Sequence, residues 1–167
     1  MKYDLYDLSI KLLEQRGVKL DDIANLVIFS QKKYYPDITN EEAMFNIQRV
    51  LKKREVQNVI VTGIQLDILA EKKLLMSPLQ EILEEDNPLY GVDEVIVLSI
   101  CNLYGSIGFT NYGYIDKVKP LILSEIDKKI DGRCNVFLDD LVGAIAAAAC
   151  SRLAHNRDAN IKGKNSK

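Results

Sequence analysis

Apolar residues recur every three to four positions along most of the chain, which is the spacing of one face of an α-helix. Leu5, Leu8 and Leu12 keep this spacing in the first segment, and Gly17 follows at a position where helices commonly end. Further periodic segments follow, and no hairpin signal stands out between them. The pattern therefore predicts an all-α protein, a compact multi-helix bundle without strands.

The last long apolar segment runs from about Val136 to about His155 and is rich in small residues. Ala144 and the alanine run 146–149 leave little side-chain bulk, so neighbouring helices can approach this segment closely. We therefore expect a central small-residue helix. Residues 157–167 are polar and predict a frayed tail, which leaves residues 1–156 as a single helical domain.

Composition narrows the class of protein. The chain has 167 residues and a net charge of −2, which gives no reason to expect a nucleic-acid partner. Its three cysteines lack a CxxC spacing and indicate reduced thiols in a cytoplasmic protein. No apolar run approaches the roughly 18 residues of a membrane-spanning helix, and the first residues carry no apolar signal region.

Carboxylates stand inside apolar sequence at three places in the second half of the chain. These are Asp93 with Glu94, then Asp116, then Asp139 with Asp140. A buried charge is unfavourable unless it is paired or binds a cation. Five such carboxylates therefore suggest a metal site, and a metal site with oxygen ligands suggests phosphate chemistry.

Simpler roles account for parts of this pattern. Both acidic pairs follow a break by a few residues, where a carboxylate gains roughly 0.3–1 kcal/mol from the free amides of a helix N-terminus. Asp116 lies inside an expected helix, and Lys119 follows three residues later, within reach of an ordinary surface ion pair. In the functional alternative, Asp116 binds a cation and Lys119 meets a phosphate group.

The order of these motifs resembles the phosphatidylglycerophosphatase A family. The motifs are Gly91-x-Asp93-Glu94, Tyr114-x-Asp116-x-x-Lys119-Pro120, Asp131-Gly132 and Phe137-Leu138-Asp139-Asp140. The resemblance is strongest over residues 91–150. It is closest to a short branch of the family that is sometimes named low temperature requirement C protein.

This resemblance implies a Mg²⁺-dependent phosphatase that converts phosphatidylglycerophosphate to phosphatidylglycerol. The acidic positions of the family motifs would hold the metal. They correspond to Asp93, Glu94, Asp116, Asp139 and Asp140. Asp116, Lys119 and Asp139 would be catalytic, with Lys119 neutralising charge on the transferring phosphoryl group.

The chain departs from the family near its N-terminus. Family members carry a Gly-rich, Pro-containing segment there, and only Pro36 and Thr39 correspond in this chain. Lys32 or Lys33 would then have to approach the phosphate in place of the glycine backbone. A lipid substrate would also require peripheral contact with the inner face of the cell membrane, for which Lys52, Lys53 and Arg54 are candidates. A small soluble phosphate ester is the alternative substrate, and homo-oligomerisation is expected from the broad apolar faces.

Two other functions stay open. An all-α nucleotide pyrophosphohydrolase also holds Mg²⁺ with helical carboxylates, although Glu81-x-x-Glu84 is the nearest acidic pair of that kind and resembles exposed surface. A non-catalytic soluble regulator that keeps the fold would explain the missing glycines. Release of pyrophosphate from nucleoside triphosphates would favour the pyrophosphohydrolase. Absence of both turnover and Mg²⁺ binding would favour the non-catalytic regulator.

Overall fold

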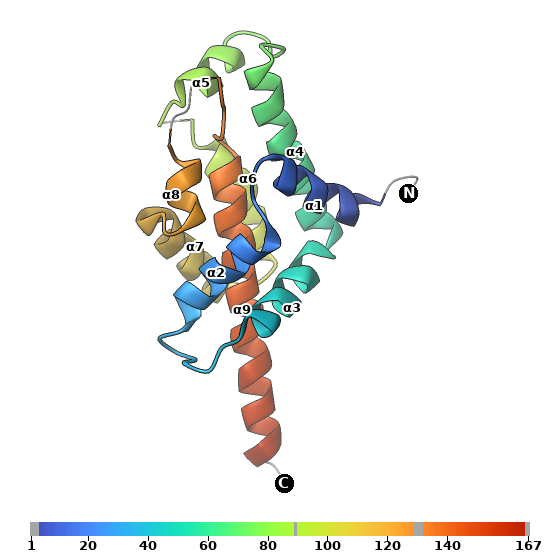
Figure 1. Ribbon diagram of the computed structural model, residues 1–167, viewed down its shortest axis with the longest axis vertical. Coiled ribbons are helices and arrows are strands. Elements are labelled where there is room, and N and C mark those ends of the chain that lie inside the picture. The colour runs from blue at the N-terminus through green and yellow to red at the C-terminus, as the bar shows by residue number, and fades with distance from the viewer. Residues whose placement is uncertain (1–3, 89, 129–131, 166–167) are drawn as a thin grey trace.

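The computed structural model describes residues 4–88, 90–128 and 132–165, and side chains up to residue 158 (Figure 1). The helices of the described chain are α1 (Leu5–Gln15), α2 (Leu20–Gln31), α3 (Asn40–Leu51), α4 (Arg54–Glu71), α5 (Leu79–Glu85), α6 (Val92–Asn102), α7 (Ser106–Val118), α8 (Ile122–Ile126) and α9 (Leu138–Asn165). No strand occurs in these residues, which confirms the all-α prediction.

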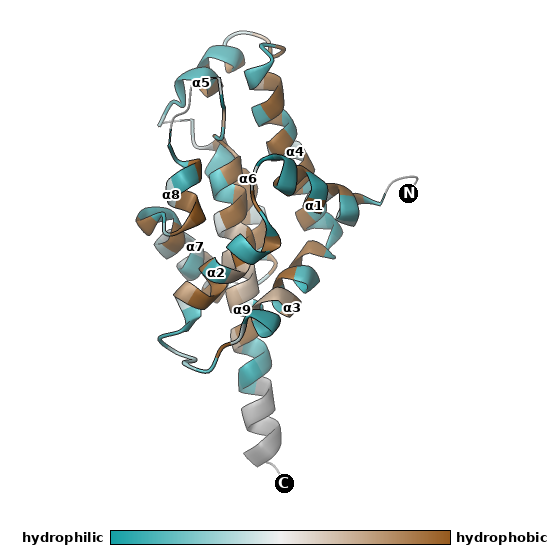
Figure 2. Ribbon diagram, in the orientation of Figure 1, coloured by the Kyte–Doolittle hydropathy of each residue, from teal (hydrophilic) through white to brown (hydrophobic). Residues whose placement is uncertain are grey.

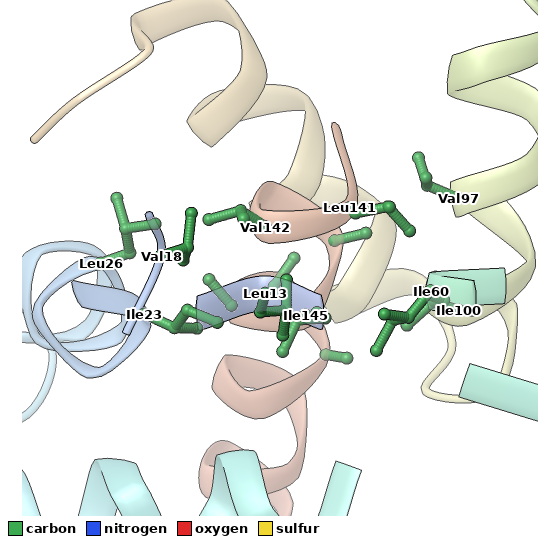
Figure 3. Packing of buried hydrophobic residues seen from close by; sticks show 14 of the residues in the cluster. Leu13, Val18, Ile23, Leu26, Ile60, Val97, Ile100, Leu141, Val142 and Ile145 are labelled. Carbon is green, nitrogen blue, oxygen red and sulfur yellow. The ribbon is translucent and has the colours of Figure 1, made fainter. Parts of the chain in front are cut away.

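Helix α9 is the central helix of the bundle, as its small residues predict. It packs against α2, α3, α4, α6, α7 and α8. Ala144 and the run 146–149 have no exposed surface. In Figure 3, Val142 and Ile145 of α9 lie between Ile23 of α2 on one side and Ile60 of α4 on the other. The small alanine side chains therefore allow several helices to pack closely around α9.

The expected end of this helix near His155 is wrong, because α9 continues to Asn165. Figure 2 shows the helix turning hydrophilic where it leaves the bundle. Arg157 lies in this extension, where its guanidinium donates to Glu42 of α3 and to Asp37, each at 2.8 Å. These charge-assisted bonds hold the polar turn that follows His155 against the bundle. Residues 166–167 of the expected tail lie outside the described chain.

The ends of the first helices follow local chemistry. Gly17 has φ +88°, and the amides of Gly17 and Val18 bond back to the last turn of α1, as expected for a glycine just past a helix end. Helix α2 begins after Lys19, whose amide donates to the Asp22 carboxylate at 2.8 Å. These contacts fix the short turn that joins α1 to α2.

Helix α4 approaches α9 unusually closely at Gly63. A Cβ atom at this position would lie 2.9 Å from the Leu141 side chain and 3.1 Å from the Phe137 Cβ. Only glycine fits here without movement of its neighbours. The close approach brings the next turn of α4 against the beginning of α9.

None of the helices described in this structure combines the length and the apolar character needed to cross a membrane.

Candidate active site

Three helix ends meet at one end of the bundle, near α5 and α8 (Figure 1). They are the beginnings of α6 and α9 and the end of α7. A polar cavity of about 540 Å³ lies between them. All six residues that the sequence singles out line this cavity, namely Asp93, Glu94, Asp116, Lys119, Asp139 and Asp140. The structure therefore brings together three motifs that are separated along the chain.

Lys119 joins the end of α7 to the beginning of α9. Its ammonium lies 2.7 Å from the Asp116 carboxylate, 2.6 Å from Asp139 and 3.9 Å from Asp140. The residue has φ +45° and caps α7, and Pro120 follows, which turns the chain away. Burial lowers the pKa of Lys119, but Asp139 and Asp116 raise it by more, so the pKa lies above its ordinary value. Lys119 is therefore a fixed positive charge among carboxylates.

Asp140 is the most deeply buried of the five carboxylates, with 5% of its surface exposed. It accepts a hydrogen bond from the Tyr112 hydroxyl of α7 at 2.8 Å. Burial and the neighbouring Asp139 charge raise the pKa of Asp140 to about 8. The ionised form of Asp140 is therefore disfavoured beside Asp139, although Lys119 lies 3.9 Å away. Tyr112 belongs to none of the motifs, although it lies one turn before Asp116.

Asp93 and Glu94 differ in their surroundings, although they are neighbours in the first turn of α6. Asp93 is half-buried, and its Oδ1 atom is buried without a hydrogen-bond partner among the described residues. Burial raises the pKa of Asp93 above its ordinary value. Glu94 is exposed at the cavity surface. Asp93 is therefore the acidic residue of α6 whose surroundings favour an added cation.

The donor set has the chemistry of a Mg²⁺ site, because carboxylate oxygens are ligands that Mg²⁺ prefers. The unpartnered Asp93 oxygen and the raised pKa of Asp140 both indicate negative charge that a divalent cation would stabilise. Among the described residues, however, no three acidic, cysteine or histidine side chains already surround a common metal position. Asp116 and Asp139 converge on the Lys119 ammonium instead.

A residue outside the motifs holds the beginning of α9. Asp67 of α4 has no exposed surface, and its Oδ1 atom accepts a hydrogen bond from the Phe137 amide at 3.1 Å. Burial raises the pKa of Asp67 to about 7. Sequence reasoning missed Asp67, although it is the only charged residue in the mainly apolar stretch 64–70, the same signal that singled out Asp116.

The expectation that Lys32 or Lys33 reaches the phosphate site is not supported by the structure. Neither lysine lines the acidic cavity. Lys33 instead lines a second cavity of about 790 Å³ between α2, α7 and α9, together with Phe29 and Tyr114. The segment that replaces the family's glycines therefore borders a different part of the molecule.

Comparison with known proteins extends the resemblance to nearly the whole chain. A family model described as Phosphatidylglycerophosphatase A matches residues 11–155. Uncharacterized protein YutG of Bacillus subtilis (strain 168) is 64% identical over 143 residues, which cover 86% of each chain. Uncharacterized protein YpjQ of the same organism is 51% identical over 152 residues, covering 91% of this chain and 85% of that protein.

Solved structures share the fold as well as the sequence. The low temperature requirement C protein from Listeria monocytogenes is 54% identical with a TM-score of 0.91, covering 95% of this chain and 99% of that one. A protein of unknown function from Bacillus stearothermophilus is 59% identical with a TM-score of 0.90, covering 93% and 97%.

Proposed function

The chain belongs to the phosphatidylglycerophosphatase A family, and from this we propose that it is a Mg²⁺-dependent phosphatase that hydrolyses phosphatidylglycerophosphate to phosphatidylglycerol. The observation that carries the proposal is the convergence of Asp116, Lys119 and Asp139 in a cavity that the other motif carboxylates also line.

In the proposed mechanism, Asp93, Glu94, Asp116, Asp139 and Asp140 hold Mg²⁺. Bound Mg²⁺ would polarise the phosphoryl group and activate a water. Lys119, whose ammonium lies 2.6 Å from the Asp139 carboxylate, would neutralise charge on the phosphoryl group as it is transferred. Asp116 and Asp139 fix the Lys119 ammonium from two helices, which limits its rotamers before substrate arrives. Tyr112 orients the Asp140 carboxylate through its hydroxyl.

The decisive experiment measures orthophosphate release from phosphatidylglycerophosphate, with and without Mg²⁺. The wild-type protein should require Mg²⁺, and Asp139→Asn should lose activity because one ligand oxygen and the partner of Lys119 change together. Asp7→Asn, an exposed carboxylate in the first turn of α1, is the matched control and should keep full activity. Full activity in Asp139→Asn would refute the mechanism. Pyrophosphate release from nucleoside triphosphates would instead favour a pyrophosphohydrolase.

We also propose that the protein reaches a lipid substrate by peripheral contact with an anionic bilayer. Exposed aromatic side chains support this, because Phe29 and Tyr114 stack with ring centroids 6.4 Å apart on the surface where α2 meets α7. Lys33, in the turn after α2, and Lys117, on α7, are also exposed. Co-sedimentation with phosphatidylglycerol vesicles should decrease in Phe29→Ser, whereas hydrolysis of a short-chain soluble substrate should not change.

Self-association is a further proposal, because large apolar side chains such as Phe45 and Val95 remain exposed on α3 and α6. Sedimentation velocity at several concentrations tests it, and a monomer at all concentrations would refute it.

A further inference from the structure

The wall of the acidic cavity includes the short segment that leads into α9. Cys134, Asn135 and Val136 line the cavity, and Phe137 follows immediately before the first residue of the helix. Residues 134–136 precede the helix, and the helical bond that reaches this segment is that from the Leu141 amide to the Phe137 carbonyl, at 3.0 Å. Its position therefore depends on side chains from other elements.

Three side chains hold Cys134 at each of its polar groups. The Cys134 amide donates to the Glu71 carboxylate at 2.9 Å, and the Cys134 carbonyl accepts from the Arg16 guanidinium at 2.6 Å. The Cys134 thiol donates to Asp67 Oδ1 at 3.7 Å. Arg16 is on the turn after α1, and Asp67 and Glu71 are one turn apart on α4.

Arg16 contacts both the segment and the side chain of Glu71 that holds it. Its Nη2 atom also lies 2.7 Å from Glu71 Oε1 and 2.7 Å from the Asn135 side-chain oxygen. The Arg16 side chain is only 9% exposed and that of Glu71 21%, so solvent weakens their pairing little. Burial raises the pKa of Glu71, but Arg16 and the Cys134 amide lower it by more, so the pKa lies below its ordinary value.

Asp67 links Cys134 to the beginning of α9, the helix that carries Asp139 and Asp140. The oxygen that accepts from the Cys134 thiol also accepts from the Phe137 amide, one of the free amides at the beginning of α9. Asp139 follows two residues later in the first turn. The close approach at Gly63, one turn earlier on α4, places Asp67 within reach of this amide.

We propose that Arg16, Asp67 and Glu71 are positioning residues for the reaction. They fix residues 134–137 and thereby set the direction in which Asp139 and Asp140 enter the cavity and meet Lys119. None of the three lines the cavity, so they act through the segment that they hold. This inference rests on the proposed phosphatase function for its kinetic consequences, but its structural part stands without it.

The second oxygen of Asp67 allows a positioning role to be distinguished from a contribution to stability. Asp67 Oδ2 is buried without a hydrogen-bond partner among the described residues. An asparagine retains the oxygen that accepts from the Phe137 amide. It also replaces a buried charge by a neutral NH2 group, and a buried neutral group without a partner is less unfavourable than a buried charge. Asp67→Asn should therefore keep the position of α9 and unfold at the same or a higher temperature.

The test compares Asp67→Ala, Asp67→Asn and Arg16→Lys with Gln65→Ala, an exposed position on the same helix. Asp67→Ala and Arg16→Lys should lower kcat roughly 10- to 100-fold, with KM changed less than about threefold, because small displacements of reacting groups have effects of this size. All three acceptors surround one nitrogen, Arg16 Nη2, and a lysine ammonium ends one bond short of that position. Asp67→Asn should restore kcat to within about threefold, and Gln65→Ala should match the wild type.

Hydrogen exchange of the metal-free proteins provides a readout that needs no turnover. Exchange of the amides of residues 134–141 should become faster in Asp67→Ala and Arg16→Lys and should stay slow in Asp67→Asn. Unchanged exchange and unchanged kcat in folded Arg16→Lys would overturn the proposal, as would an Asp67→Asn variant that behaves like Asp67→Ala. Faster exchange in a protein whose wild type hydrolyses no phosphate ester would support the positioning group and refute the proposed function.

Discussion

At the scale of single residues, Lys119 is the centre of the candidate site. Its ammonium contacts carboxylates from two helices at 2.6 and 2.7 Å, and its side chain is 27% exposed. Without it, Asp116 and Asp139 would face each other with like charge in a partly buried cavity. The same residue thus serves the fold and, in the proposed function, the substrate.

Removing this charge should affect both stability and activity. Lys119→Gln should lower the free energy of unfolding by about 2 kcal/mol at pH 7, less than the roughly 3–5 kcal/mol of a fully buried pair, because water still reaches the side chain. It should also lower kcat at least about 100-fold. Lys11→Gln is the control, since Lys11 is exposed on α1 and forms no ion pair among the described residues. Urea denaturation and phosphate release measure the two effects, and equal behaviour of the two variants would contradict this role.

Asp67 makes stability depend on pH in a definite direction. Its pKa is about 7 in the folded protein, above the ordinary value of 3.8, so the folded state binds more protons than the unfolded state between these values. Stability should therefore fall as pH rises from about 4 to about 7 and change no further above that range. The raised pKa of Asp140 changes stability with pH in the same direction. The effect of Asp67 is therefore measured as the difference between the wild type and a variant that lacks this carboxyl group.

Asp67→Asn should remove this part of the pH dependence. Its melting temperature should fall less steeply between pH 4 and 7 than that of the wild type, and the two proteins should differ most above pH 7. Differential scanning calorimetry without metal measures the slopes. Parallel curves for the two proteins would show that Asp67 does not titrate in this range.

At the scale of elements, α4 and α9 are coupled through one glycine. Gly63→Ala places a methyl group 2.9 Å from the Leu141 side chain, and such overpacking typically lowers stability by about 1–3 kcal/mol. Gly113→Ala on α7 meets no atom within 4 Å and should raise stability by about 0.5–1 kcal/mol through helix propensity. Chemical denaturation compares the variants. A Gly63→Ala variant as stable as Gly113→Ala would show that the helices can move apart freely.

The helical fold and the central helix could be predicted from the sequence. The spacing of apolar residues indicates which face of a helix is buried, and a run of alanines indicates where helices pack closely. The end of α9 could not be predicted, since Arg157 is held by Glu42 and Asp37, residues distant along the chain. The six motif residues were found because they stand in apolar sequence and in family order. Asp67 stands in apolar sequence too, but its role depends on a contact with Phe137 that no spacing encodes.

At the scale of the whole molecule, the proposed Mg²⁺ site predicts that the metal stabilises the folded state, because the proposed ligand carboxylates come together only on folding. A metal concentration 100 times the dissociation constant should add about 2.7 kcal/mol to the free energy of unfolding. Thermal unfolding with MgCl₂ should show a higher melting temperature than with NaCl of equal ionic strength, and Asp139→Asn should lose most of the difference. An equal shift in both proteins would place the metal elsewhere.

The bond between Arg16 and the Cys134 carbonyl joins residues 118 positions apart. All six motif residues lie within positions 93–140, yet the cavity wall at Cys134 is bonded to the turn between α1 and α2. We therefore do not expect the motif region to form the cavity when it is separated from the beginning of the chain. We therefore expect the cavity wall to be complete only when the beginning of the chain has met the segment before the last helix.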